Sequence, residues 1–265
     1  MSQFLTTAMQ AVNEAERITL RYYGRNPKVQ SKADGSPVTL ADKNAEKGII
    51  ATIRKTFPGH SFYGEEYGRS DERSEYLWVI DPIDGTKNFV GQIPLWGNLL
   101  ALMHYDDVIL GVSNVPLLRE RLWAEKGKGS YLNGKRVRVS PIKTVNQSMI
   151  SFSSLSSFNR IRLGSRILKL VDNCKRARSF GDLWAYHLLA SGKLEIVTEG
   201  QIKPMDIAPF VRIMSESGGE TSDLKGHPFN LKISSFLATN GRVHQEALAY
   251  FGKYICPTDH HLGRE

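Results

Sequence analysis

Apolar residues recur at helical spacing at the start of the chain. Those between residues 4 and 23 predict an amphipathic helix, and residues 28–38, which are polar and include Gly and Pro, predict a loop or a weak hairpin. Thr39 and Asp42 are typical of a helix start. The apolar residues behind them predict a second amphipathic helix, which a Pro-Gly pair at residues 58–59 ends.

Two short apolar runs then lead directly into acidic residues. Residues 61–64 predict a strand that delivers Glu65 and Glu66 at its end. Residues 78–80 predict a buried strand. We expect this strand to stop at Asp81, because the proline that follows has no N–H with which to extend a ladder.

The pattern from residue 96 to residue 139 is that of an antiparallel meander. Short apolar runs alternate with turn residues, and the Asn-Gly pair at residues 133–134 is a strong hairpin signal. The expected strands cover residues 99–103, 108–112, 121–124 and 129–132.

Beyond residue 149 the rhythm changes to strands that alternate with helices, which indicates parallel or mixed pairing under crossover helices. The expected strands are 149–152, 178–180, 194–197 and 236–239, and the expected helices are 161–171, 182–190, 205–217 and 241–251. We see no repeat and no low-complexity linker. The change near residue 145 therefore predicts an N-terminal half, 1–145, and a C-terminal half, 146–265.

Composition restricts the class of protein but does not indicate a function. The chain has 265 residues, enough to bury a core, and no apolar run approaches the length of about 20 residues that spans a bilayer. The first residues lack the pattern of a signal peptide, and Cys174 and Cys256 are too few for a disulfide framework. We expect a cytoplasmic protein with reduced thiols and no membrane partner.

The net charge of +8 has two interpretations. The basic residues are scattered and are not interleaved with aromatic residues, which favours solvated faces and predicts no nucleic-acid partner. The other interpretation, a genuine polyanion site, would make binding to nucleic acid steeply dependent on salt.

The stretch around Asp81 and Asp84 carries the strongest chemical signal. Gly85 closes a tight turn after the two carboxylates, and Thr86 follows with a hydroxyl. Because Asp, Pro and Gly are the usual turn formers, the stretch also fits an ordinary surface turn. Its neighbours in the chain have to decide between the two interpretations.

Three acidic groups occupy comparable places at a strand end or a helix start: Glu65 with Glu66, Asp81 with Asp84, and Asp206. If they converge, two carboxylates about 4 Å apart repel by roughly 4 kcal/mol at an effective dielectric constant near 20. Such a cluster protonates, pairs with Lys or Arg, or holds a multivalent cation. Oxygen ligands without His or Cys favour Mg²⁺ over Zn²⁺.

These stretches resemble the three metal-binding motifs of the inositol monophosphatase superfamily. Residues 64–66 read Gly-Glu-Glu, residues 78–89 read Trp-Val-Ile-Asp-Pro-Ile-Asp-Gly-Thr-Lys-Asn-Phe, and residues 203–208 read Lys-Pro-Met-Asp-Ile-Ala. Residues 38–42, 218–219 and 238–241 match as well, so the resemblance covers nearly the whole chain. The central motif is specific, whereas the other two would be weak alone.

The resemblance implies two or three Mg²⁺ ions per site. Glu65, Asp81 and the carbonyl of Ile83 would hold the ion that activates water. Asp81, Asp84 and Asp206 would hold a second ion beside the leaving oxygen. The chain would then hydrolyse a small phosphorylated metabolite.

The same resemblance assigns the remaining roles. Thr86, paired with Asp42, would take up the proton of the attacking water, and the amides of Gly85 and Thr86 would seat the phosphate. Glu66 is a further candidate for supporting the metal site, and Lys32 could reach the phosphate from its loop. The implied fold is a layered α/β/α/β/α sandwich of the α/β (α+β) class. The implied assembly is a homodimer.

One departure from the family pattern lies beside Asp206. Met205 stands where the family usually has Trp, and Pro209 is expected in the first turn of the helix, where Pro is tolerated. Metal binding should therefore survive. The packing behind Asp206, and with it the shape of the substrate pocket, is left open.

Other segments resemble histidinol-phosphate phosphatases of the actinobacterial and plant type: residues 151–156, 180–186 and 203–204. Gly181, Asp182, Glu199 and Asp84 are the candidate substrate-binding residues. Histidinol phosphate carries an ammonium and an imidazole, which Asp182 and Glu199 could accept. Inositol phosphates and other phosphomonoesters remain open as substrates, since Glu199 also suits inositol hydroxyls.

The aromatic residues that follow Asp182 are expected to belong to the core. Trp184, Tyr186 and Leu188 lie at spacings that favour packing over a pocket. The seven histidines are dispersed and none has ligand spacing. A different class, a metal and phosphate sensor without turnover, is disfavoured because Thr86 and Asp42 form a pair that a pure binder does not need.

Overall fold

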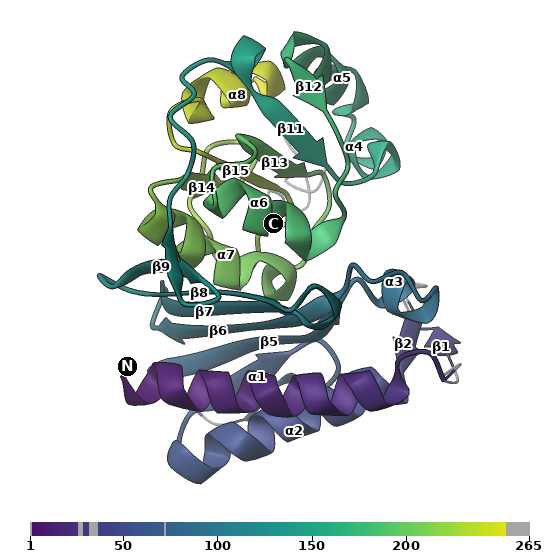
Figure 1. Ribbon diagram of the computed structural model, residues 1–265, viewed down its shortest axis with the longest axis vertical. Helices are drawn as coiled ribbons and strands as arrows, with labels where there is room; N and C mark the ends of the chain where they lie inside the picture. Colours follow the sequence, from purple (N-terminus) through teal and green to yellow (C-terminus); the bar gives the residue numbers. More distant parts are fainter. Residues whose placement is uncertain (1, 26–28, 32–36, 72, 253–265) are drawn as a thin grey trace, which may run out of the picture.

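Helices α1 (Gln3–Tyr22) and α2 (Leu40–Thr56) cover one face of a sheet (Figure 1), which confirms both predicted helices. The start of α2 is fixed by a capping box. The backbone N–H of Thr39 donates to the carboxylate of Asp42 at 2.8 Å, while the Thr39 hydroxyl accepts from the helix. The buried faces of both helices pack on the strands below them.

The computed structural model describes residues 2–25, 29–31, 37–71 and 73–252 of the chain. Within them β1 (Val29–Ser31) pairs with β2 (Pro37–Thr39) in antiparallel fashion, so the predicted weak hairpin is observed. Lys32 lies outside the described residues.

The first sheet has eight strands and contains the predicted meander. Its order is β10-β9-β8-β7-β6-β5-β3-β4, and only β3 and β5 run parallel. The strands are β3 (Ser61–Gly64), β4 (Gly68–Arg69), β5 (Tyr76–Asp84), β6 (Gly97–His104), β7 (Asp107–Val115), β8 (Glu120–Glu125), β9 (Gly129–Leu132) and β10 (Lys135–Val137). The short helix α3 (Thr86–Val90) follows β5, and a 3₁₀ turn (Pro116–Leu118) joins β7 to β8.

The second sheet has five strands in the order β12-β11-β13-β15-β14, and its pairing is mixed as predicted. The strands are β11 (Met149–Phe152), β12 (Arg176–Ala177), β13 (Ile196–Glu199), β14 (Glu220–Ser222) and β15 (Phe236–Thr239). A 3₁₀ turn (Val145–Gln147) precedes β11. The short strand β14 was not predicted.

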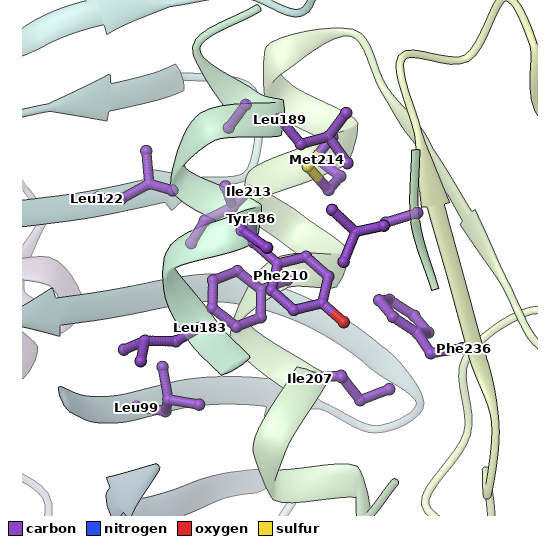
Figure 2. Packing of buried hydrophobic residues seen from close by; sticks show 14 of the residues in the cluster. Leu99, Leu122, Leu183, Tyr186, Leu189, Ile207, Phe210, Ile213, Met214 and Phe236 are labelled. Atoms are coloured by element: carbon purple, nitrogen blue, oxygen red, sulfur yellow. The ribbon is translucent and has the colours of Figure 1, made fainter. Parts of the chain in front are cut away.

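Helices α6 (Asp182–Ala190) and α7 (Pro204–Ser217) lie between the sheets (Figure 1). Beyond the second sheet lie the outer helices α4 (Leu155–Arg160), α5 (Gly164–Asn173) and α8 (His244–Phe251). Figure 2 shows the middle core, where Leu183, Tyr186 and Phe210 meet. The predicted α/β/α/β/α sandwich is confirmed.

Strand β5 runs past the point where we expected it to end. It reaches Asp84, because the register against β6 shifts between Asp81 and Asp84 and the ladder does not use an N–H at Pro82. The carbonyl of Pro82 instead accepts a hydrogen bond from the side chain of Asn98 at 2.8 Å. The prediction that the strand stops at Asp81 is wrong.

Two further predictions in the C-terminal half are wrong in position. The expected helix 161–171 corresponds to α5, which begins only at Gly164, after Arg162 with its left-handed φ of 60°, and the separate helix α4 before it was not predicted. The expected strand 178–180 is displaced to β12. Beyond β12 the N–H of Phe180 bonds to the side chain of Ser151 rather than to a backbone carbonyl, so the ladder ends.

Met205 and Pro209, the residues that depart from the family pattern beside Asp206, both lie in α7. Met205 is buried in a cluster with residues of the first sheet, such as Val79 and Met103. Pro209 lies inside the helix, beyond the first turn where we expected it. Its backbone approaches β7 closely at Gly111, where an added Cβ would lie 2.2 Å from the Pro209 carbonyl oxygen. Small size at position 111 therefore lets α7 pack tightly on the sheet.

No helix in the described ranges is long and apolar enough to cross a membrane. The division into halves at residue 145 stays a prediction.

Candidate functional site

The acidic residues singled out from the sequence come from three elements. Strands β3 and β5 are parallel, with Gly64 opposite Ile80, so Glu65 and Asp81 follow at the same sheet edge. The N–H of Glu65 donates to the Ile80 carbonyl at 3.1 Å. Asp206 lies in the first turn of α7, and its carboxylate accepts from the N–H of Lys203 at 3.0 Å.

Charge repulsion shows that these carboxylates act on one another. Burial raises the pKa of Asp81 well above its usual range, and Glu65, Asp84 and Asp206 raise it further. Burial also raises the pKa of Asp206 to about 7, with a further contribution from Glu65. A bound multivalent cation would therefore stabilise the ionised form of these acids.

The donor set fits a hard cation better than a soft one. The carboxylates supply only oxygen atoms, the type of ligand that Mg²⁺ prefers. Among the described residues, no three or more His, Cys, Asp or Glu side chains are arranged so that they could hold a metal ion as they stand. The ammonium of Lys203 lies 3.2 Å from Glu65 Oε1 and gives that carboxylate a cationic neighbour.

Thr86 and Asp42 meet as expected from the sequence. The Thr86 hydroxyl lies 3.4 Å from Asp42 Oδ1 and 3.0 Å from the carbonyl oxygen of Ile83. Asp42 is fully buried, and burial raises its pKa although Thr39 donates two hydrogen bonds to its other carboxylate oxygen. This pair can hold a hydroxyl proton and pass it to a carboxylate.

Gly85 shapes the turn between β5 and α3. Its φ of 79° is left-handed, and an added Cβ would lie 3.0 Å from the Leu95 carbonyl oxygen and 3.2 Å from Asp182 Oδ2. The backbone N–H groups at the start of α3 lack carbonyl partners within the helix. Gly85 and Thr86 can therefore offer amides to an anion beside the carboxylates.

A cavity of about 490 Å³ opens beside the acidic cluster. Asp84, Gly181, Asp182, Glu199 and Asp206 are among the residues that line it. The cavity thus joins the candidate metal ligands to the candidate substrate-binding residues. Glu65, Asp81, Thr86 and Gly85 are not among its lining residues, and Glu66 is not either.

Asp182 and Glu199 each accept a hydrogen bond from a neighbouring side chain. Asp182 accepts a hydrogen bond from the Asn88 side chain at 3.1 Å, and burial raises its pKa. Burial raises the pKa of Glu199 to about 8, against a hydrogen bond from Ser153. The two groups favour a ligand that supplies donors or positive charge.

Tyr186 departs in part from its prediction. Tyr186 is buried in the middle core, and Trp184 and Leu188 pack against that core, as predicted. Tyr186 also lines the cavity. A helix that carries Asp182 places the residue four positions later on the same face, and this spacing was the signal that could have found it.

Sequence reasoning also missed Glu46, which supports the loop after β3. Glu46 is fully buried, and its carboxylate accepts from the N–H groups of Glu66 and Tyr67 at 2.9 and 3.2 Å. An added Cβ at Gly64 would lie 1.8 Å from Glu46 Oε1, so this contact requires glycine. The signal was an acid one helical turn after Asp42 on the buried face of α2.

A model of the inositol monophosphatase family matches residues 1–255. The chain belongs to the inositol monophosphatase family. It is 34% identical over 252 residues to the histidinol-phosphatase of Mycobacterium tuberculosis, with 92% of this chain and 96% of the relative covered. It is 32% identical over 255 residues to the fructose-1,6-bisphosphatase/inositol-1-monophosphatase of Thermotoga maritima, with 95% and 96% covered.

A solved structure agrees with this assignment. An IMPase of Thermotoga maritima matches with a TM-score of 0.86 and 30% identity, and the match covers 96% of this chain and 98% of that chain. The family member described here is a phosphomonoester hydrolase of a metal-dependent family, and its substrates are small phosphorylated metabolites.

Proposed function

We propose that this chain is a Mg²⁺-dependent histidinol-phosphate phosphatase, which converts L-histidinol phosphate and water to L-histidinol and phosphate. The observation that carries the proposal is the lining of the cavity, where Asp182 and Glu199 supply two acids. No Lys or Arg belongs to the described residues that line the cavity. The organic part of the substrate therefore meets carboxyl and hydroxyl groups.

The metal would be held by the carboxylates of Glu65, Asp81, Asp84 and Asp206 and by the Ile83 carbonyl. When bound, Mg²⁺ supplies a Lewis acid that lowers the pKa of water and neutralises charge on the phosphate. The family resemblance and the mutual repulsion of the acids support this assignment.

The chain's own residues then orient the reaction. Thr86 holds a proton at its hydroxyl, and Asp42, which lies 3.4 Å away, can receive it. The amides of Gly85 and Thr86 seat the phosphate. Because these groups contact only the phosphate, selectivity has to come from the side chains that contact the organic group.

The ammonium of histidinol phosphate is complementary in charge to the acids that line the cavity. This ammonium can pair with Asp182, whose pKa is raised by burial and which gains from a cationic partner. A charged hydrogen bond in a partly desolvated site contributes about 1.5–3 kcal/mol. The histidinol-phosphatase named among the relatives supports the same substrate.

Inositol phosphate is the second candidate, because Glu199 and the serine hydroxyls of the cavity can also bind ring hydroxyls. The relative from Thermotoga maritima carries that activity in its name. A bisphosphate fits less well, since its second phosphate would meet acids without a lysine or arginine among the described lining residues.

Phosphate release tests the proposal. We expect wild-type protein to hydrolyse histidinol phosphate with a higher kcat/KM than inositol phosphate, fructose bisphosphate or adenosine bisphosphate, and to lose this activity in excess chelator. Full activity in chelator would contradict the metal assignment. Phosphate binding that depends on Mg²⁺ but occurs without turnover would instead support a non-catalytic sensor.

We also propose a cytoplasmic homodimer. The assembly is supported by the family resemblance, and the compartment by the presence of only two cysteines in the chain.

A further inference from the structure

Two buried polar side-chain atoms have no hydrogen-bond partner within the described part of the chain: Trp96 Nε1 and Tyr186 Oη. Trp96 packs in a separate cluster with Phe89 and does not line the cavity, whereas Tyr186 does. A buried hydroxyl without a partner costs about 1–3 kcal/mol, a cost that phenylalanine would avoid in the same space. A hydroxyl at this position therefore indicates a hydrogen-bond partner from outside the chain.

The ring of Tyr186 holds its hydroxyl in a fixed place. It stacks on Phe210 with ring centroids 4.2 Å apart and an angle of 15° between the planes, and it packs 6.0 Å from Phe236. Figure 2 shows the Tyr186 oxygen beyond this stack, on the side where Ile207 and Phe236 lie. The ring is 2% exposed, so rotation into bulk solvent would break the middle core.

Carboxyl groups surround this hydroxyl. Burial raises the pKa of Tyr186 well above its usual range, and Glu199, Asp84, Asp206 and Asp182 raise it further. Tyr186 and Glu199 line the same cavity. A tyrosine hydroxyl can donate one hydrogen bond and an ionised carboxylate accepts, so the two residues match a ligand group that offers both an acceptor and a donor.

We propose that the Tyr186 hydroxyl is a specificity-determining hydrogen-bond donor to the organic group of the substrate. With histidinol phosphate it donates to the unprotonated imidazole nitrogen, while Glu199 accepts from the N–H of the other nitrogen. The identity of this ring rests on the proposed function; the role of the hydroxyl rests on its burial without a partner, its fixed ring and the place of Tyr186 among the residues that line the cavity. Imidazole has a single acceptor atom, so losing the tyrosine hydroxyl leaves that atom unpaired, whereas inositol has several hydroxyl groups that can find other partners.

The test is Tyr186→Phe, with Tyr131→Phe as the matched control. Tyr131 is a tyrosine whose exposed hydroxyl bonds to the Lys128 carbonyl and which does not line the cavity. We expect Tyr186→Phe to lower kcat/KM for histidinol phosphate by about tenfold to a hundredfold and to lower it less for inositol phosphate. Inhibition by inorganic phosphate should be unchanged, and inhibition by histidinol should weaken. Tm should stay the same or rise, because the variant removes a buried hydroxyl that has no partner in the protein.

Two outcomes would overturn the inference. Unchanged kcat/KM on the preferred substrate would show that the hydroxyl does not contact it. A fall in Tm by several degrees would show that the hydroxyl is satisfied inside the folded protein, for example by a fixed water. If the wild type prefers another phosphomonoester, the proposed substrate fails alone, and the same comparison on that preferred ester decides the role of Tyr186.

Discussion

At the scale of single residues, the site depends on the hydrogen bonds that position its acids. Asp84 accepts the backbone N–H of Leu183 at 2.9 Å, so this carboxylate connects the acidic cluster to the first turn of α6. Burial raises its pKa well above the usual range, and Asp182 and Asp206 raise it further. One residue thus belongs to the proposed metal site and to the wall of the cavity.

Asp84→Asn tests this dual position. The substitution removes one negative charge and keeps an oxygen that can accept from Leu183. We expect kcat to fall by about a hundredfold or more with a small change in KM, because charge on the leaving oxygen develops only in the transition state. Steady-state kinetics at saturating Mg²⁺ measures both constants.

Thermal unfolding in chelator provides a second measurement on the same variant. The Tm of Asp84→Asn should equal or exceed that of wild type, since one of several repelling acids is gone. The exposed helix residue Asp172, changed to Asn, serves as the control. A normal kcat for Asp84→Asn would show that Asp84 is only a turn residue.

At the scale of elements, the position of Asp206 depends on the contact between α7 and β7. An added Cβ at Gly111 would lie 2.2 Å from the carbonyl oxygen of Pro209 and 2.8 Å from its Cα, and both of these are backbone atoms. Neither can move without moving the helix. The glycine therefore sets the separation between the helix that carries Asp206 and the sheet that carries Asp81.

Gly111→Ala should destabilise the protein by about 1–3 kcal/mol, because the helix has to shift to relieve the overlap. The loss of kcat should exceed that explained by the unfolded fraction, since Asp206 would move with the helix. Chemical denaturation and kinetics measure the two effects. The control is Gly59→Ala, where an added Cβ meets nothing within 4 Å. Equal stability of the two variants would contradict the contact.

Sequence reasoning predicted most elements because their signals are local. The helix start at Thr39, the hairpin at residues 133–134 and α6 each follow from adjacent residues. The motif residues Glu65 and Asp81 could also be placed, since two parallel strands end together. Long-range support could not be predicted: the position of Glu46 on the buried face of α2 does not show that its carboxylate accepts from the loop after β3, and the contact behind Asp206 has no local signature.

At the scale of the whole molecule, the second sheet and the outer helices are joined by buried polar contacts. His244, at the start of α8, contacts Ser222 Oγ at 2.9 Å and Thr239 Oγ1 at 3.1 Å. It is 1% exposed, and burial lowers its pKa from 6.5 to about 4. The folded protein therefore favours the neutral imidazole.

This depressed pKa predicts a pH-dependent stability. Because the folded pKa lies below the unfolded one, the contribution is fully present above pH 6.5 and is lost as the pH falls towards 4. The loss is at most about 3 kcal/mol. His244→Gln should be less stable than wild type at pH 7.5, and urea denaturation should show that difference shrinking by pH 4.5. A constant difference between the two proteins would contradict the account.

The central claim is that Asp182 and Glu199, two acids that line the cavity, select a cationic organic group. The most direct measurement is kcat/KM for histidinol phosphate and for inositol phosphate on wild type, Glu199→Gln and Asp182→Asn. We predict that wild type prefers histidinol phosphate and that each substitution lowers its kcat/KM by about tenfold to a hundredfold, with a smaller loss on inositol phosphate. Equal losses on both substrates, or a wild type that prefers inositol phosphate, would contradict the claim.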